Sequence, residues 1–267
     1  MCRSDATERN LQSGTAIALT LFGAPGSADL GASESAQVMR PTALASMQTL
    51  AMNAIDIVHQ DEQLLVLNKP CGLLSVPGRG PDKQDCLSSR VQAQFPQARV
   101  VHRLDMDTSG LMIMALDSQT QRTLSQAFAQ REISKRYEAV VLGTPTAPQT
   151  DDQGWALIDL PILLDWPKRP MRIINSAGKP SQTRWRLMKS MGIHSLVQLE
   201  PLTGRSHQLR VHLQAIGHTI VGDRLYGSPT TSTSRLMLHA GELKFTHPRD
   251  GHVLHLRCPS GFATMRH

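Results

Sequence analysis

Residues 137–202 contain five apolar segments that follow one another along the chain. They read YEAVVLG (137–143), WALIDLPIL (155–163), MRIIN (171–175), QTRWRLMK (182–189) and HSLVQLEPL (194–202). Short segments rich in β-branched and aromatic residues, separated by turn residues, are typical of β-strands. Because no helix alternates regularly with them, they favour antiparallel pairing over repeated βαβ units.

The flanking segments add further strands and a few helices. Strands are expected at IDIVH (55–59), LLVLNK (64–69), LMIMAL (111–116), 243–246 and 253–256. Helices are expected around Leu87 and Val91, from Ser118 as the capping residue through Arg131, and over residues 207–216, where Gly217 stops the last one. The predicted fold class is therefore α+β, with a mixed, largely antiparallel sheet flanked by a few helices.

The chain changes character near residue 53. Residues 1–52 are rich in Ala, Ser, Thr and Gly and lack periodic apolar positions, so we expect a disordered N-terminal leader. Residues 53–267 are expected to form one folded domain. Met47 and Met52 precede this boundary, and a start at either position would remove most of the leader.

Charge and composition favour a nucleic-acid partner. Lys and Arg number 28 against 22 Asp and Glu, which gives a net charge of +6. No run of about 18 apolar residues is present to span a membrane. The four cysteines form no Cys-x-x-Cys pair, and we expect a reducing, cytoplasmic environment.

The segment 102–110, HRLDMDTSG, places reactive groups in a turn between two apolar strands. Alternation along an extended backbone puts Arg103 and Asp105 on the same side, next to the apolar Leu104 and Met106. In isolation, such a turn is more often a solvated surface feature with a local ion pair. Its position between two buried strands favours a functional site.

A second polar segment, TGRSHQLRVH (203–212), joins a strand end to a helix start. Ser206 can cap the helix, whose N-terminus would favour an anion, and Arg205 can reach a carboxylate or phosphate. His207 and His212 are five residues apart, which does not place both rings on one helix face. We therefore expect no metal site here.

Two shorter signals have little functional weight alone. Tyr137 follows Lys135 and Arg136 at a strand start, and such a tyrosine more often packs in the core. Lys69 and Pro70 end an early strand at a Gly- and Pro-rich loop.

Taken together, these segments resemble the RluA-type pseudouridine synthases. The resemblance rests on NKPCGLLSVPGR (68–79), VHRLDMDTSGL (101–111), REISKRYEAVVLG (131–143), PLTGRSHQLRVHLQAIGHTIVGDRLYG (201–227) and LMLHA (236–240), whose order and spacing match across residues 55–262. Within the family, LPILLDWPKRP (160–170) and GKPSQT (178–183) are similar to the short, dual-specificity members that lack an S4 RNA-binding domain and act on large-subunit ribosomal RNA and tRNA.

The resemblance implies specific roles. Asp105 would be the catalytic carboxylate, Tyr137 would stack on the target base and Arg205 would pair with Asp105. Arg103 would fill the position that the flipped nucleotide leaves. The residues expected to contact RNA are Arg103, Lys69, His207 and Arg210.

The resemblance also implies uridine isomerisation in stem-loops of 23S ribosomal RNA, tRNA or both. This reaction needs no cofactor and no metal, and Asp105 could act as a nucleophile or as a base. The expected partner is structured RNA rather than a membrane, and the expected state is a monomer. The alternatives are a non-catalytic RNA-binding module, a metal-dependent hydrolase and a synthase that acts on one RNA class only.

Overall fold

The computed structural model describes residues 55–227 and 233–264, all of which lie in the unit formed by residues 48–267. The predicted leader lies outside the described residues. Within these two ranges, no helix is long and apolar enough to cross a bilayer.

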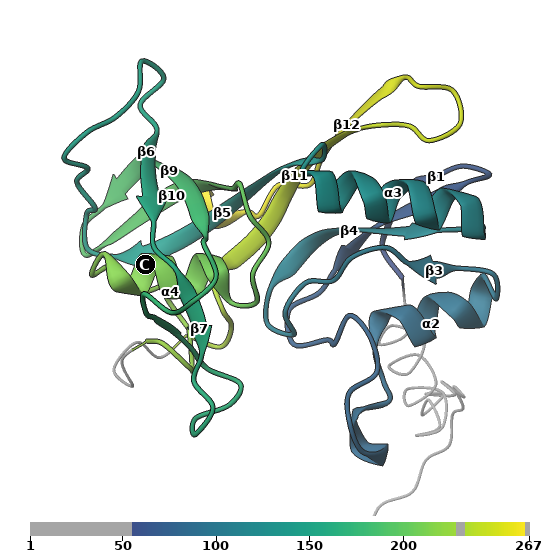
Figure 1. The fold of residues 1–267 in the computed structure, drawn as a ribbon, viewed down its shortest axis with the longest axis horizontal. Helices are drawn as coiled ribbons and strands as arrows, with labels where there is room; N and C mark the ends of the chain where they lie inside the picture. Colours follow the sequence, from purple (N-terminus) through teal and green to yellow (C-terminus); the bar gives the residue numbers. More distant parts are fainter. Residues whose placement is uncertain (1–54, 228–232, 265–267) are drawn as a thin grey trace, which may run out of the picture. The chain divides into compact units, whose positions relative to one another are not determined.

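A ten-stranded mixed sheet forms the centre of the fold (Figure 1). Its main path runs β1-β2-β4-β11-β5-β10-β9-β6, with β3 added to β4 and β12 added to β11. All strand pairs are antiparallel except β4 with β11. The strands are β1 (Ile57–Gln60), β2 (Leu64–Lys69), β3 (Arg99–Val100), β4 (Ser109–Ala115), β5 (Ser134–Leu142), β6 (Ala156–Asp159), β9 (Gln182–Met191), β10 (His194–Pro201), β11 (Leu238–Thr246) and β12 (Val253–Arg257). The predicted α+β class is confirmed.

Helices α2 (Leu87–Gln94) and α3 (Ser118–Gln130) cover opposite faces of the β2–β4 part of the sheet. Strand β2 alternates between them: Leu65 and Leu67 pack in the cluster that contains α2, and Leu64 and Val66 pack in the cluster that contains α3. Because both faces are covered, β2 and β4 read as continuous apolar runs rather than as alternating ones. All seven residues of β4 are buried.

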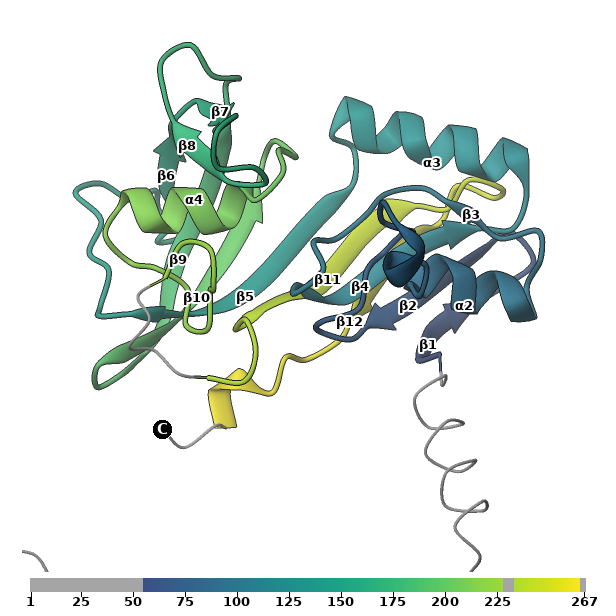
Figure 2. The same cartoon turned by 90° about the horizontal axis from the view of Figure 1, so that it is seen from below.

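Helix α4 (Gln208–Ala215) packs on the other part of the sheet, where it crosses β9 and β10 (Figure 2). Leu209 and Leu213 of α4 join a core formed by β5, β6, β9 and β10. A separate two-stranded sheet, β7 (Ile162–Leu164) with β8 (Arg172–Ile174), lies next to α4. Short 3₁₀ turns occur at Pro81–Lys83 and Phe262–Thr264.

Local details differ from the sequence-based expectations at three places. The segment WALIDLPIL forms two strands, β6 and β7, because Pro161 between them has no N–H to donate to a ladder. Asp117, not Ser118, caps α3, since its carboxylate accepts from the N–H groups of Gln119 and Thr120. The residue before α4 is His207, in the left-handed conformation and without a side-chain cap, so Ser206 does not have the predicted role.

Gly110 joins β4 to β11 where the two strands run parallel. Its φ is +111°, and a Cβ there would lie 2.3 Å from the carbonyl oxygen of Ala240. Glycine tolerates the positive φ and avoids the clash with Ala240, because it lacks a Cβ. The close approach fixes the end of the HRLD turn against β11 and thereby positions Asp105.

Candidate active site

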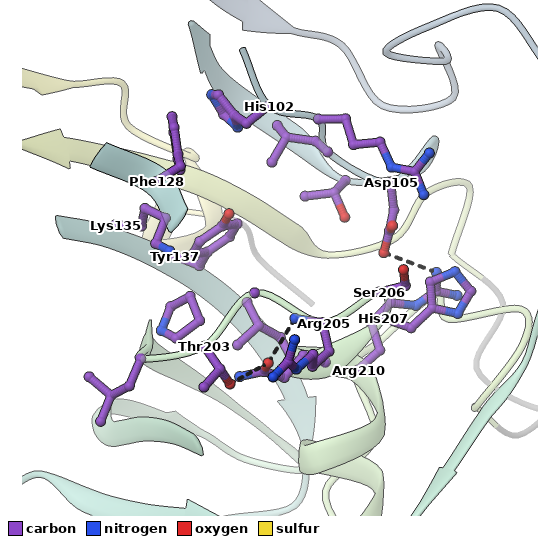
Figure 3. Close-up of a pocket in the computed structure, with 18 of the residues that line it drawn as sticks. His102, Asp105, Phe128, Lys135, Tyr137, Thr203, Arg205, Ser206, His207 and Arg210 are labelled. Atoms are coloured by element: carbon purple, nitrogen blue, oxygen red, sulfur yellow. Dashed lines mark hydrogen bonds and ion pairs between the residues drawn. The ribbon is translucent and has the colours of Figure 1, made fainter. Parts of the chain in front are cut away.

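A cavity of about 490 Å³ brings together three segments that are far apart in the sequence (Figure 3). They are the HRLD turn, the end of α3 with the start of β5, and the loop that leads into α4. Among the described residues that line it, Asp105 is the only carboxylate. The lining also carries five Arg and Lys residues: Arg103, Arg131, Lys135, Arg205 and Arg210.

Asp105 faces Arg210 rather than Arg205. Nη1 of Arg210 lies 3.9 Å from Oδ2 of Asp105, and the Asp105 side chain is 30% exposed while that of Arg210 is 3% exposed. Figure 3 shows the Asp105 carboxylate directed toward this guanidinium, beside His207. The expected Asp105–Arg205 pair is therefore wrong, and the buried Arg210 takes its place.

A second carboxylate holds Arg210 in position. Nε and Nη2 of Arg210 each donate to an oxygen of the fully buried Asp223 at 2.7 Å. Burial lowers the pKa of Arg210, but the hydrogen bonds and charge of Asp223 outweigh it and hold that pKa above its usual value. Because two donors are bound to Asp223, only Nη1 remains to face the cavity. The geometry is that of a bidentate pair, which lysine cannot reproduce.

Arg205 lies on an exposed part of the cavity wall. Its backbone N–H donates to Oε1 of the buried Gln208, and its Nη2 donates weakly to the carbonyl of Pro180 at 3.4 Å. Gln208 also accepts from the Thr203 hydroxyl at 2.7 Å, so it holds the loop in shape. The exposed guanidinium of Arg205 is available to a ligand that enters the cavity.

Tyr137 extends from β5 into the cavity, on the side away from Arg210 (Figure 3). Burial raises the pKa of Tyr137, and the nearby charge of Asp105 raises it further. The phenol therefore stays neutral at physiological pH. The stacking role that the resemblance implies for Tyr137 stays a prediction.

Lys69 is not at the cavity surface. Its side chain has no exposed area, and Nζ donates to the carbonyls of Pro70, Leu73 and Met106 at 2.7–2.9 Å. Burial lowers the pKa of Lys69 to about 8, so most of the population remains protonated at pH 7 and can donate all three bonds. The expectation that Lys69 contacts RNA is therefore wrong, because the ammonium instead fixes the backbone next to Asp105.

His207 contributes through Tyr226, which had no predicted role. The Tyr226 hydroxyl lies 2.8 Å from Nδ1 of His207 and accepts from the N–H of Arg172 in β8 at 2.8 Å. Burial lowers the pKa of His207, and Arg210 adds to this, although the charge of Asp105 opposes it. A neutral His207 lines the cavity, and Tyr226 links it to β8.

His102 and Arg103 are adjacent but differ in their surroundings. Nε2 of His102 accepts from the N–H of Ile113 at 2.9 Å, and its ring lies 4.3 Å from that of Phe128. Burial lowers the pKa of His102 to about 3, and Lys135 adds a smaller effect in the same direction. Arg103 is exposed at the cavity wall.

The histidines near α4 do not converge on a common point. His207 contacts Tyr226, His212 contacts Thr183 and the carbonyl of Leu160, and His218 contacts the carbonyl of Leu142. Each ring has its own partner, so this part of the described chain contains no ligand set for a metal.

Sequence reasoning identified Asp105, Tyr137 and Arg103 at the cavity but missed Asp223 and Tyr226. Both lie in GDRLYG (222–227), 13 and 16 residues after Arg210. A buried arginine requires a carboxylate partner. The segment GDRLYG contains one carboxylate, Asp223, and this signal could have identified the Arg210–Asp223 pair. Chemically, the cavity presents one carboxylate beside a fixed cation and a neutral phenol, under a basic rim suited to a polyanion.

Comparison with known proteins gives a consistent result. The family model for RNA pseudouridylate synthase matches residues 63–215. The "Dual-specificity RNA pseudouridine synthase RluA" of Escherichia coli K12 is 44% identical over 210 residues, which cover 77% of this chain and 93% of that protein. The Vibrio vulnificus protein of the same name is 46% identical over 216 residues and is covered over 84% of its length. Among solved structures, human RNA Pseudouridylate Synthase Domain Containing 1 matches with a TM-score of 0.65 and 29% identity, over 79% of this chain and 85% of that one.

Proposed function

This chain belongs to the RNA pseudouridylate synthase family and is an RNA uridine isomerase, and we propose that Asp105 is its catalytic carboxylate. One observation carries the proposal: Asp105 is the only carboxylate among the described residues that line a basic cavity. The fixed guanidinium of Arg210 faces it.

The reaction breaks the bond between N1 of uracil and C1′ of ribose, turns the base and forms a bond between C5 and C1′. The hydrogen on C5 is lost as a proton and N1 gains one, so the product is an isomer. Asp105 can attack C1′ as a nucleophile or remove a ribose proton in an elimination route. Either role uses the carboxylate oxygens, and Nη1 of Arg210 lies 3.9 Å from one of them.

We assign Tyr137 to the target base and Arg103 to the RNA helix that the base has left. The Tyr137 ring lies in the cavity and remains neutral, which suits stacking on a uracil. Flipping a nucleotide costs a few kcal/mol, about the amount that phosphate contacts from the basic rim can offset. Exposed Arg103 and Arg205 are placed to supply such contacts.

We further propose that the substrates are stem-loops of both 23S ribosomal RNA and tRNA. The support is that relatives 44–46% identical to this chain are dual-specificity RNA pseudouridine synthases. Short hairpins with a shared loop sequence would be recognised by shape and by unpaired bases. A synthase restricted to one RNA class is the alternative. We expect a monomer in the cytoplasm, where both RNAs are found.

The catalytic assignment is tested by comparing Asp105→Asn with Asp107→Asn. Asp107 lies in the same turn but does not line the cavity, so its variant controls for charge and folding. We expect Asp105→Asn to abolish pseudouridine formation while RNA affinity changes only a few-fold, and Asp107→Asn to retain turnover. Appreciable turnover by Asp105→Asn would contradict the assignment.

Substrate scope is tested with an isolated anticodon stem-loop, a ribosomal hairpin with the same loop sequence and a fully duplexed control. Modification of both hairpins but not of the duplex supports dual specificity. Modification of only one hairpin supports the single-class alternative.

A further inference from the structure

A group of histidine and aspartate side chains lies outside the cavity, where two turns meet. The first is the turn at residues 247–252, which joins β11 to β12 (Figure 1). The second joins β1 to β2 and contains Asp61. None of these residues lines the cavity around Asp105.

Three side chains of the β11–β12 turn converge. One ligand atom from each of His247, Asp250 and His252 lies within 4.8 Å of the other two. Nδ1 of His247 lies 3.2 Å from Oδ1 of Asp250, and Nδ1 of His252 lies 2.5 Å from the same oxygen. Two imidazole nitrogens that approach one carboxylate oxygen require a proton or a cation among them.

His247 is the fixed member of this group. Its side chain is 3% exposed, and its Nδ1 accepts from the N–H of Arg249 at 3.3 Å. This bond places a lone pair, rather than a proton, on the nitrogen that faces Asp250. A metal ion binds a neutral imidazole nitrogen through this one lone pair, so the ion would replace the long 3.3 Å bond from Arg249.

The opposite nitrogen of His247 faces Asp61. Nε2 has no hydrogen bond of regular geometry, although Oδ2 of Asp61 lies 3.2 Å away. Asp61 is itself held by the N–H groups of Gln63 and Leu64, at 2.8 and 2.9 Å, and by His59. A carboxylate behind the ring of a metal-binding histidine is the usual arrangement, because it orients the ring and strengthens the ligand.

The positively charged side chain of Arg249, in the same turn, does not lie between His247, Asp250 and His252. Arg249 forms an ion pair with Glu62 of the β1–β2 turn. The side chains of His252 and Asp250 are 52% and 55% exposed, so both can rotate toward a common ion.

We propose that His247, Asp250 and His252 bind one divalent transition-metal ion, of which zinc is the best match. Imidazole nitrogen and carboxylate oxygen bind zinc at about 2.0–2.2 Å, and water can complete a four-coordinate site. Asp61 acts as a positioning residue through His247. The ion ties the β11–β12 turn to the β1–β2 turn and takes no part in the reaction at Asp105.

The test uses the full-length protein without a histidine tag, stripped with chelator and titrated calorimetrically with zinc chloride. We expect one ion per chain. His252→Gln and Asp250→Asn should each weaken binding more than about tenfold, and Asp61→Asn about tenfold or more. His255→Gln is the matched control, because His255 is an exposed β12 residue that pairs with Glu242 outside the group. Its affinity should equal that of the wild type.

Thermal unfolding gives a second readout. Zinc at about a hundredfold its dissociation constant should raise the wild-type Tm by several degrees, but not that of His252→Gln. Each variant in EDTA should unfold in one cooperative transition, which shows that it folds. The inference is wrong if the wild type takes up no zinc, or if zinc binding survives unchanged in both His252→Gln and Asp250→Asn.

Discussion

Replacing Arg210 and Arg205 separately by lysine tests which cation acts on Asp105. Both substitutions keep the positive charge and remove the planar guanidinium. Arg210 is buried and bound through two nitrogens to Asp223, whereas Arg205 is exposed and makes one weak side-chain bond. Because the chemical change is the same at both sites, any difference reflects the position of each residue.

The expected magnitude follows from the 3.9 Å between Nη1 of Arg210 and Oδ2 of Asp105. Unit charges at that distance attract by about 1 kcal/mol in water and about 4 kcal/mol at an effective dielectric constant of 20. Asp105 is 30% exposed, so a value of about 2–3 kcal/mol is reasonable. A lysine that remains bound to Asp223 cannot also reach Asp105. Because only the part of this attraction that is stronger in the transition state affects the rate, the rate should fall by at most about 30- to 150-fold.

Stability provides a second quantity. Arg210→Lys replaces two charge-assisted hydrogen bonds to Asp223 by one, which should cost about 1.5–3 kcal/mol of unfolding free energy. Arg205→Lys should change that free energy by less than about 0.5 kcal/mol, as is usual for exposed positions.

The assay is a single-turnover measurement of tritium release from RNA labelled at C5 of uridine, at saturating enzyme. Urea unfolding and RNA affinity are measured on the same preparations. We expect Arg205→Lys to stay within about threefold of the wild-type rate, because the substitution leaves an exposed charge in place. A severe rate loss in Arg205→Lys with near-normal turnover in Arg210→Lys would refute this reasoning. It would show that Arg205, as the sequence resemblance implies, is the cation that acts on Asp105.

Four further outcomes are expected. His102→Gln should remove a pH dependence of stability: because the pKa of His102 falls from 6.5 unfolded to about 3 folded, its contribution is present above pH 6.5 and is lost as pH falls toward 3. Between pH 6 and 4.5 the wild type should lose up to about 2 kcal/mol more than the variant. Lys69→Met should destabilise the fold by about 2–4 kcal/mol in urea unfolding, since it leaves three carbonyls without their donor. EDTA should leave the rate on a prefolded RNA unchanged, because the reaction proposed at Asp105 uses side chains and no metal ion. Arg103→Ala should slow modification of a hairpin far more than it weakens binding.

Each of these has an outcome that contradicts it. Equal pH profiles for wild type and His102→Gln would show that another group titrates. A stable Lys69→Met would mean that water satisfies the three carbonyls. Activity lost to EDTA and restored by zinc would support metal-dependent catalysis, and equal losses of rate and affinity in Arg103→Ala would show that it only adds charge.

The sequence by itself determined the elements and the reactive turn. Apolar runs at residues 64–67 and 111–115 predicted two strands, and in the structure α2 and α3 cover their opposite faces. Asp105 and Tyr137 were predicted as site residues because the motifs that contain them resemble those of the RluA-type pseudouridine synthases. Local backbone preferences and side-chain alternation extend over a few residues, so these features were available from the sequence alone.

Only the tertiary structure decided which partners meet. Arg205 and Arg210 lie five residues apart in one polar motif, and nothing local states which one turns toward Asp105. The choice depends on burial of Asp223 beneath α4, since a carboxylate removed from water must take the arginine that packs against it. Lys69 shows the same limit, because its charge suggested a surface contact and packing instead enclosed it among three carbonyls. Pairings of this kind depend on desolvation, which arises only when distant segments come together.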